Sequence, residues 1–373
     1  MLKNDTTRVP KILHVVISMV VGGAERLVYD MVRYPTFSGN RPVVCCMDSI
    51  GELGEKLQEE GYKVYCKVRR PGLDFELITW LRDIIRLENA NVVHAHQYSP
   101  LFYSVPAALL AGRVKVVYTE HGRFYPERKS WKRSLFNPLL ALGVDHLVSI
   151  SEATAQAMAT YDNLPLRRIK VILNGIDCSG MNPEIDKAAK RRALGLSDTC
   201  RVIGTAARLN SIKNIQMMLR VLKLVLQSVP DTCLVIAGQG EEEERLKALA
   251  LELGINDQVK FIGLRFDLPE IYQLFDVFLL TSFSEGISVT LLESMASGVP
   301  SVVTDVGGNR EVVVGGETGY LLPVDEDIKM VQKISELLDD NDLLIRIGLA
   351  AHQRVVREFS VQGMMEAYCR LYE

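Results

Sequence analysis

The stretch SFSEGISVTLLESMASGVP, residues 282–300, decides how this chain is organised. It lies between two short apolar runs, 276–280 and 300–303, and both runs are typical of buried strands. Residues 289–297 are rich in helix formers, and Ser288 is placed to cap a helix that begins there. The stretch therefore predicts a strand, a loop, a helix and a second strand, which together make one α/β unit.

The junction between this loop and this helix has the features of an anion-binding site. The first turn of a helix leaves amide groups unpaired and carries partial positive charge, so it attracts phosphate. Gly286 has no Cβ and lets a ligand approach the backbone. Glu285 stands just before the helix and Glu293 about one turn inside it, so their carboxylates suit hydroxyls on both sides of a diphosphate. A nucleotide sugar is such a ligand, but two glutamates eight residues apart are more often solvated helix charges.

The sequence that follows makes the pattern specific, because it continues as ASGVP (296–300), SVVTDVGGNRE (301–311) and GETGYLL (316–322). Together with Glu285 and Glu293, these residues resemble the E-x7-E region of retaining GT-B glycosyltransferases of family 4. The resemblance implies two Rossmann-like βαβ domains that face a central cleft. It also implies that Glu285 is catalytic and that Glu293 holds the donor ribose. The donor-binding residues implied here are Glu285, Gly286, Ile287, Ser288, Val289, Thr290 and Glu293.

The composition sets the class of protein. A chain of 373 residues is long enough for two domains, and its net charge of −3 gives no overall attraction to nucleic acid. The first half carries an excess of Lys and Arg and the second an excess of Asp and Glu, and a basic first half suits an acidic acceptor or an anionic membrane surface. The seven cysteines form no C-x-x-C pair, so we expect free, buried thiols in a reducing cytoplasm and no zinc site.

No apolar run reaches the roughly 20 residues that a membrane-spanning helix needs, and the first ten residues are polar. We therefore expect a cytoplasmic protein that is soluble or attached to the inner face of the cytoplasmic membrane.

The first half alternates between strands and helices. Apolar runs predict strands at 11–18, 42–47, 63–68, 92–96, 114–121 and 146–150. Amphipathic runs predict helices at 24–34, 52–60, 75–88, 101–111, 132–142 and 153–161. Such alternation indicates a parallel sheet covered on both faces, whose ligands bind at the carboxyl ends of the strands.

Three places in this half follow strand ends and are candidate ligand sites. Gly22 and Gly23 follow the first strand, and a plain β–α turn is the favoured explanation when these residues are taken by themselves. The resemblance implies that they lie against the donor phosphates and that Glu25, just beyond, is on the acceptor side. His121 ends a strand beside Gly122, and the resemblance implies that it contacts the donor sugar; a structural histidine is the alternative. His96 and Tyr98 are acceptor candidates, while His94 is expected in the core.

A basic and aromatic run, RFYPERKSWKR, spans residues 123–133. It suits a membrane-facing patch that brings the enzyme to a lipid-linked acceptor, and Arg123 at its start is an acceptor candidate. A solvated loop whose long side chains pack on the core is the alternative.

The second half supplies the remaining donor candidates. The segment 171–177, VILNGID, resembles the link between the two domains of the family. Arg208 and Lys213 follow the strand that begins at Val202, where two cations can hold a diphosphate as it leaves. They also resemble a family signature and are therefore predicted to be catalytic and donor-binding. By the same resemblance, backbone near Leu264 meets the nucleotide base.

These observations predict an N-terminal domain (1–175, acceptor side), a C-terminal domain (176–358, donor side) and a last helix (359–373) that packs back on the first. The predicted reaction moves a sugar from a nucleotide diphosphate sugar, UDP-sugar before GDP-mannose, to a hydroxyl of a saccharide or lipid-linked acceptor in polysaccharide or glycolipid biosynthesis. Arg208, Lys213 and the helix start would do the work of a metal, so no metal or other cofactor is expected. A nucleotide-sugar epimerase, a sugar phosphorylase and a catalytically silent binding subunit remain as alternatives.

Overall fold

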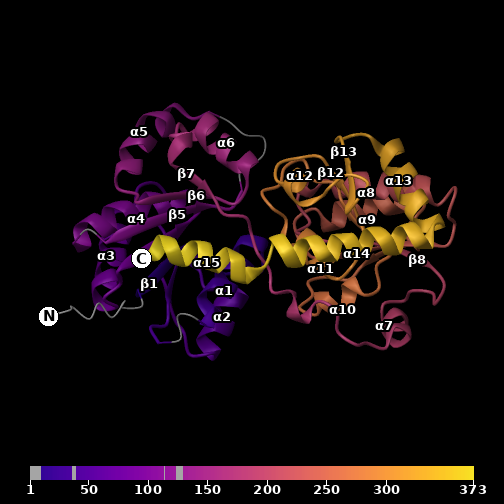
Figure 1. The fold of residues 1–373 in the computed structure, drawn as a ribbon, viewed down its shortest axis with the longest axis horizontal. Helices are drawn as coiled ribbons and strands as arrows, with labels where there is room; N and C mark the ends of the chain where they lie inside the picture. The colour runs from indigo at the N-terminus through magenta and orange to yellow at the C-terminus, as the bar shows by residue number, and fades with distance from the viewer. Residues whose placement is uncertain (1–9, 36–38, 113, 123–128) are drawn as a thin grey trace. The chain divides into compact units, whose positions relative to one another are not determined.

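The computed structural model describes residues 10–35, 39–112, 114–122 and 129–373. The chain divides into two compact units, one made of Met1–Asn174 with Val361–Glu373 and the other of Gly175–Ser360. Each unit is built on one parallel sheet with helices packed against it (Figure 1). The predicted α/β fold class with two Rossmann-like units is confirmed.

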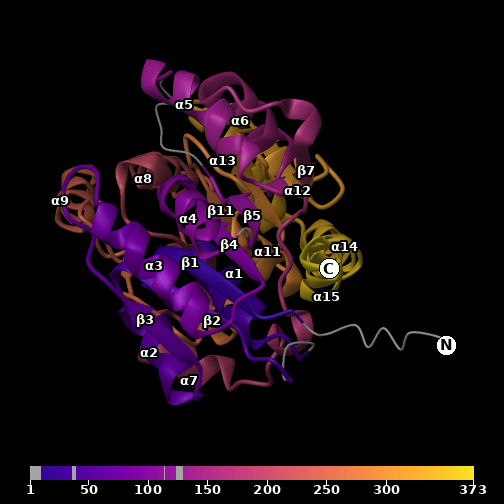
Figure 2. The same cartoon turned by 90° about the vertical axis from the view of Figure 1, so that its left-hand side faces the viewer.

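The sheet of the first unit has seven parallel strands in the order β3-β2-β1-β4-β5-β6-β7, which Figure 2 shows fanning from β3 to β7. Their bounds along the sheet are Lys63–Cys66, Val43–Ser49, Ile12–Ser18, Val92–His96, Lys115–Glu120, His146–Ser149 and Ile169–Val171. The order reverses between β1 and β4, because the chain builds outward to β3 first and then returns to the other side of β1. Ligands of doubly wound sheets bind at such a switch point.

Helices cover both faces of this sheet because its side chains alternate in direction. Leu13 and Val15 belong to one apolar core with α3 and α4, whereas Val16 belongs to a second core with α1 and α2. The helices of this unit are α1 (Gly23–Arg33), α2 (Gly51–Glu59), α3 (Phe75–Leu87), α4 (Tyr98–Ala111), α5 (Trp131–Leu142), α6 (Glu152–Asp162), the 3₁₀ turn η2 (Leu166–Arg168) and α15 (Val361–Tyr372).

The last helix, α15, belongs to the first unit and packs on β5 (Figures 1 and 2). Its Tyr368 hydroxyl lies 3.1 Å from Thr119 Oγ1, and its Tyr372 hydroxyl lies 2.8 Å from His94 Nδ1. The chain leaves the second unit at Ser360, where the amide of Ile176 donates to the carbonyl of Phe359. The start and the end of the second unit therefore lie side by side.

The sheet of the second unit has six parallel strands in the order β10-β9-β8-β11-β12-β13. Their bounds are Val259–Phe261, Thr232–Ala237, Arg201–Ala206, Val277–Leu280, Ser301–Thr304 and Gly319–Leu322. The helices are α7 (Lys187–Ala193), α8 (Ile215–Val225), α9 (Glu243–Leu253), α10 (Leu268–Tyr272), α11 (Val289–Ala296), α12 (Asn309–Val312), α13 (Asp327–Asp339) and α14 (Asn341–Glu358), with 3₁₀ turns η3 (Cys178–Gly180) and η4 (Ser211–Lys213). Here the order reverses between β8 and β11.

Two details differ from the sequence predictions. The helix predicted at 101–111 begins at Tyr98, because Gln97 takes a positive φ of 71° that turns the chain directly from β4 into α4. The cysteines are all free, as predicted, but only Cys45, Cys46 and Cys200 are buried. Cys66, Cys178, Cys233 and Cys369 are half-buried, because they lie near strand or helix ends rather than in the sheet interior.

Candidate functional site

The candidate donor site lies at the carboxyl ends of β8 and β11, the switch point of the second sheet. Arg208 and Lys213 are on the loop after β8, and the segment 282–288 follows β11. The two strands are neighbours in the sheet although two other strands, β9 and β10, lie between them in the chain. The sheet order thus brings together the two motifs that the sequence analysis selected separately.

Lys213 and Glu285 form an ion pair at this point. The Lys213 ammonium donates to Glu285 Oε1 at 2.6 Å, and the side chains are only 21% and 8% exposed. The Ser282 hydroxyl donates to the same carboxylate oxygen at 2.5 Å. Within the described chain no hydrogen bond to Glu285 Oε2 is found, whereas Oε1 has two donors. The sequence analysis did not identify Ser282 as part of the site.

Backbone contacts hold the two loops together. The Thr281 hydroxyl donates to the carbonyl oxygens of Lys213 and Asn214, at 3.2 and 2.9 Å. The amide of Phe283 donates to the carbonyl of Ile212, at 2.8 Å. Since the loop of the cation is fixed to the loop of the carboxylate, the ammonium of Lys213 is presented at a defined position.

The start of α11 supplies amide groups beside the pair. Ser288 caps this helix by accepting from the amide of Leu291, at 3.4 Å. The amides of Val289 and Thr290 have no acceptor among the described residues, which is the condition in which a helix start binds an anion. The predicted helix start is thus present, capped by Ser288 and with free first-turn amides.

Glu293 is held one turn further along α11. The hydroxyl of Tyr272 donates to Glu293 Oε2 at 2.9 Å, and Tyr272 is fully buried. Burial raises the pKa of Tyr272 well above its usual range, so the phenol keeps its proton and remains a donor. Tyr272 therefore orients Glu293. Tyr272 was not among the predicted site residues, because the sequence shows only a tyrosine in an apolar helix.

Two glycines after β12 allow close packing against the backbone of Glu285 and Gly286. A Cβ at Gly307 would lie 1.8 Å from the Glu285 carbonyl oxygen, and one at Gly308 would lie 1.9 Å from that of Gly286. Gly307 also has a φ of +50°, in the left-handed region. The loop after β12 thus supports the segment that carries the carboxylate.

Replacement of Gly307 by alanine is expected to lower the free energy of unfolding by about 2–4 kcal/mol, because left-handed strain adds to a steric overlap with backbone. Gly316→Ala is the matched control: Gly316 has a φ of +78° but nothing within 4 Å of its Cβ position, so about 1 kcal/mol is expected. Urea unfolding of both variants measures the difference. Equal losses would mean that the close approach to Glu285 does not matter.

The structure does not join the other two donor candidates to this pair. The side chain of Arg208 is exposed and makes no hydrogen bond or ion pair with any described residue. Leu264 is half-buried in the loop after β10, two strands away from β8. Both lie at the same carboxyl edge of the sheet as Lys213.

The candidates of the first unit gather at its own switch point. Gly22 caps α1 and Gly23 begins it, directly after the turn that follows β1. Glu25, His96 and Gln97 line one small hollow between β1 and β4. His96 is buried and is the last residue of β4.

The remaining acceptor candidates are Tyr98 and Arg123. The Tyr98 hydroxyl donates to Asn137 Oδ1 of α5 at 2.8 Å, and its ring packs under the Arg133 guanidinium, so this side chain has structural partners. Arg123 lies outside the described residues.

His121 follows the last residue of β5, and its ring is held by another histidine. His121 Nε2 lies 2.8 Å from His96 Nδ1, and its Nδ1 has no partner in the described part of the chain. Burial lowers the pKa of His121 to about 4, so the imidazole is neutral at pH 7. A neutral ring can offer a ligand either a hydrogen-bond donor or an acceptor.

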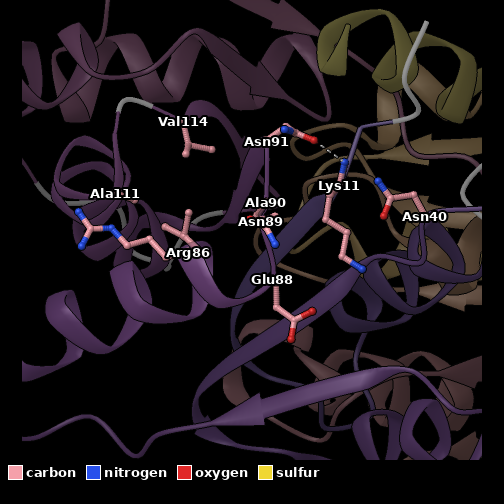
Figure 3. Close-up of a pocket in the computed structure, with 10 residues that line it drawn as sticks. Lys11, Asn40, Arg86, Glu88, Asn89, Ala90, Asn91, Ala111 and Val114 are labelled. Carbon is pink, nitrogen blue, oxygen red and sulfur yellow. Dashed lines mark hydrogen bonds between the residues drawn. The ribbon is translucent and has the colours of Figure 1, made fainter. Parts of the chain in front are cut away.

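A cavity of the first unit lies away from this switch point. It measures about 860 Å³ and is lined by Lys11, Asn40, Glu88 and Asn91, among others (Figure 3). These residues lie where β1 and β4 begin, whereas ligands of parallel sheets bind where strands end. We therefore place the site by sheet topology and not by cavity size. None of the described helices is long and apolar enough to span a membrane.

Two family models and several known proteins match this chain. Residues 21–179 match the family model described as Glycosyltransferase Family 4, and residues 186–354 match that of Glycosyl transferases group 1. A D-inositol 3-phosphate glycosyltransferase of Corynebacterium urealyticum is 30% identical over 340 residues, which cover 85% of this chain and 76% of that protein. The UDP-Gal:alpha-D-GlcNAc-diphosphoundecaprenol alpha-1,3-galactosyltransferase of Escherichia coli is 25% identical over 97% of this chain and 96% of that protein.

Among solved structures, Anabaena Alr3699/HepE in complex with UDP-glucose superposes with a TM-score of 0.87 over 97% of this chain and 98% of that one, at 24% identity. The two family models together span both units, and the solved structure shares the whole fold. The resemblance seen in the sequence is therefore confirmed, and the chain belongs to the GT-B glycosyltransferases of family 4.

Proposed function

We propose that this enzyme moves a sugar from a nucleotide diphosphate sugar to a hydroxyl of a saccharide or lipid-linked acceptor and keeps the anomeric configuration. A UDP-sugar is the favoured donor and GDP-mannose the next. The observation that carries the proposal is the Lys213–Glu285 pair beside the free amides of α11, at the switch point of the second sheet. The UDP-glucose named with the Anabaena structure and the UDP-Gal named with the E. coli relative support the choice of base.

The chemistry follows from the charges. As the glycosidic bond to the diphosphate breaks, negative charge grows on the leaving group and positive charge grows on the anomeric carbon. Lys213, Arg208 and the amides of Val289 and Thr290 stabilise the first of these charges, which is the role of a preorganised cationic site. Glu285 stabilises the second. Glu293, oriented by Tyr272, holds the ribose hydroxyls.

A cationic site of this kind needs no metal to neutralise the diphosphate. We therefore propose metal-independent transfer in which the acceptor hydroxyl attacks from the face that the diphosphate leaves. The carboxylate of Glu285 is already paired with Lys213 and Ser282, so it serves as an electrostatic partner rather than a nucleophile.

Thermal unfolding with a panel of UDP, GDP, UDP-glucose, UDP-galactose, UDP-N-acetylglucosamine and GDP-mannose, all with EDTA, tests the donor assignment. Stabilisation by one nucleotide and its sugar is expected, since a ligand that binds only the folded state raises the midpoint. The control is the same panel with Mg²⁺ in place of EDTA. A shift that needs Mg²⁺, or none with any nucleotide, would contradict the proposal and favour a phosphorylase or a silent subunit.

A lipid-linked acceptor is supported by the exposed face of α5. Trp131, Leu135, Phe136, Leu139 and Leu142 are all more than half exposed, and at about 100° per residue they fall on one side of the helix. Asn137 and Ala141 are buried on the opposite side. The membrane-facing patch was predicted at residues 123–133; residues 123–128 lie outside the described chain, and the apolar face extends along the helix beyond residue 133. Lys129 and Lys132 border it and suit anionic lipid headgroups.

Leu139→Asp is expected to weaken binding to phosphatidylglycerol vesicles about tenfold, because a leucine side chain that enters the interface is replaced by a charge. Co-sedimentation measures the bound fraction. Leu251→Asp on α9 is the matched control, since Leu251 is 67% exposed against 65% for Leu139. Equal binding by the two variants, or no binding by the unmodified protein, would remove the membrane contact from the proposal.

A further inference from the structure

Four histidines of the first unit lie on one face of its sheet. The alternation Val93-His94-Ala95-His96 directs both histidines of β4 away from the core of α3 and α4, which contains Val93 and Ala95. The register pairs His94 with His14 of β1 and pairs His96 with Thr119 of β5. Residues paired in a parallel register share a face, and His121 lies two residues after Thr119. The fold thus places His14, His94, His96 and His121 together.

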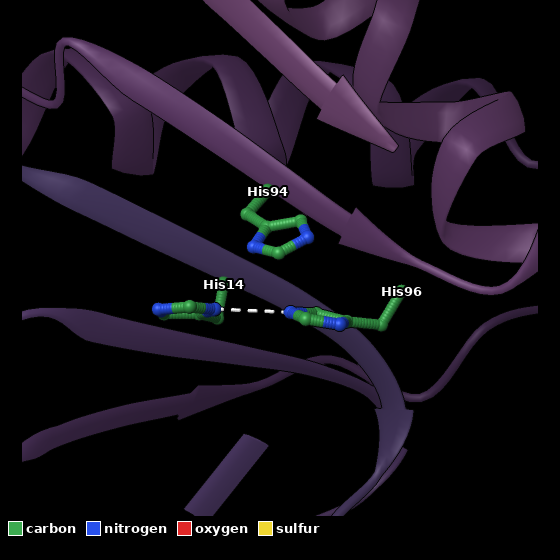
Figure 4. Close-up of side chains that lie close together, drawn as sticks. All are labelled: His14, His94 and His96. Carbon is green, nitrogen blue, oxygen red and sulfur yellow. Dashed lines mark hydrogen bonds between the residues drawn. The ribbon is translucent and has the colours of Figure 1, made fainter. Parts of the chain in front are cut away.

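Three of these rings form a hydrogen-bonded row. His14 Nδ1 lies 3.0 Å from His96 Nε2, and the other nitrogen of that ring, His96 Nδ1, lies 2.8 Å from His121 Nε2. Neighbouring rings are inclined by only 19° and 26°, so each contact runs nearly in the ring planes. Figure 4 shows the first of these contacts, with His94 lying over it. The outer nitrogens, His14 Nε2 and His121 Nδ1, have no partner among the described residues.

All three rings are neutral at pH 7. Burial lowers the pKa of His14 to about 3 and that of His121 to about 4, and it lowers the pKa of His96 well below its usual range. A neutral imidazole carries one proton, and each contact in the row needs one nitrogen with a proton and one without. Only two arrangements meet both conditions. Either every ring carries its proton on Nδ1, or every ring carries it on Nε2.

We propose that His14 and His96 are positioning residues that couple the tautomer of His121 to their own. In the first arrangement the free Nδ1 of His121 is a hydrogen-bond donor, and in the second it is an acceptor. The two buried rings therefore fix both the orientation of His121 and the hydrogen-bonding role that it offers to a ligand. That the ligand is a sugar hydroxyl rests on the proposed function, whereas the coupling itself does not.

The same cluster includes three histidines whose nitrogens lie within 4.8 Å of one another, His14, His94 and His96, a set that could hold a metal ion. The contacts favour the row of hydrogen bonds. Both nitrogens of His94 are already engaged, with the Tyr372 hydroxyl and with Thr119 Oγ1 at 2.8 Å each. The His94 ring centroid lies 4.0 Å from that of His96, so the rings lie over each other rather than pointing at a shared centre. A divalent cation here would also be buried beside neutral ligands alone.

Long-range ¹H–¹⁵N correlation spectra of protein labelled at histidine nitrogen test the coupling without any substrate. The expected result is the same tautomer, or the same tautomer fractions, in His14, His96 and His121, assigned by loss of signals in single variants. Different fractions in the three rings, a charged ring at pH 7, or a stoichiometric metal found by elemental analysis would overturn the proposal. The spectra are recorded on the unliganded enzyme, so they test the coupling even if the proposed function is wrong.

Two variants at His96 and one at His94 distinguish a positioning role of the His96 ring from a role in packing alone. His96→Phe keeps the ring volume but breaks both contacts, so the tautomer fractions of His14 and His121 should diverge and UDP release from UDP-glucose should fall about tenfold. His96→Asn places an amide near the former Nδ1 and should recover most of that rate. His94→Phe is the matched control, since His94 is as buried as His96 but lies outside the row. In this variant the tautomer fractions of His14, His96 and His121 should stay equal. Two outcomes would indicate that His96 acts through packing alone. One is a rate of UDP release as low in His94→Phe as in His96→Phe, and the other is a rate in His96→Asn no higher than in His96→Phe.

Discussion

Replacement of Lys213 by alanine is expected to lower turnover by about 10²–10³-fold, the scale of a lost preorganised contact to developing charge. The backbone of the loop that carries Lys213 is fixed by two contacts, from the Thr281 hydroxyl to the Lys213 carbonyl and from the Phe283 amide to the Ile212 carbonyl. In the unliganded enzyme the partner of the Lys213 ammonium is Glu285, at 2.6 Å. In the proposed reaction it turns to the diphosphate, so its loss should weaken UDP binding as well as slow the chemical step. Steady-state kinetics and UDP titration measure the two effects.

The alanine variant also leaves Glu285 nearly buried without its cation, so a loss of stability must be separated from a loss of function. Arg220→Ala is a suitable control. Arg220 makes an ion pair of 2.7 Å with Asp327 in the same unit but lies on α8, away from the carboxyl ends of the strands. It should lose some stability while UDP affinity and turnover stay unchanged. If Lys213→Ala kept its UDP affinity, or if Arg220→Ala lost it equally, the donor site would be misplaced.

The sequence allowed the motifs of the second unit to be predicted because they lie in loops. Glu285, Gly286, Ser288 and Lys213 lie outside the strands, where hydrophobic patterning imposes no choice of residue, so their identity carries information about a ligand. The β–α alternation also predicted a parallel sheet, since helices must return the chain to the same edge after each strand. Those two signals, together with the resemblance to the family, led to the predicted fold class and the donor-side candidates.

What the sequence could not provide is the order of the strands. Lys213 and Glu285 are 72 residues apart, and they meet only because β11 pairs with β8 rather than with β10. His14 lies inside a strand, ILHVVIS, that has the pattern of plain core. It becomes a partner of His96 only through the pairing of β1 with β4. Tyr272 and Ser282 likewise gain their roles from tertiary contacts with Glu293 and Glu285.

The two units differ in where their candidate residues lie, and this difference determines how much the sequence could indicate about each. In the second unit the chemistry lies on loops and a helix start. In the first unit it extends into the sheet interior through His96 and His14, both fully or almost fully buried. A histidine in or just after a strand is consistent with a structural role until its neighbours are known, which is why sequence alone left His121 with that alternative.

Glu285→Gln is expected to separate binding from chemistry. The amide has the size of the carboxylate and its oxygen can still accept from Lys213 and Ser282, so the loop should keep its conformation. UDP affinity should be unchanged or higher, because the carboxylate no longer competes with the diphosphate for the ammonium. Turnover should nevertheless fall by about 10²–10³-fold, because no negative charge remains near the anomeric carbon as positive charge develops there.

This combination of retained binding and lost turnover distinguishes Glu285 from Lys213, whose removal should affect both. It also distinguishes an electrostatic role from a structural one, since a structural role predicts a lower free energy of unfolding with a proportional loss of UDP affinity. Glu293→Gln provides the comparison on the same segment: its partner Tyr272 can still donate to the amide oxygen, and its expected effect is on nucleotide affinity rather than on the chemical step. Normal turnover in Glu285→Gln would show that the charge of this carboxylate is not used in transfer, and the anomeric centre would then have to lie away from the Lys213–Glu285 pair.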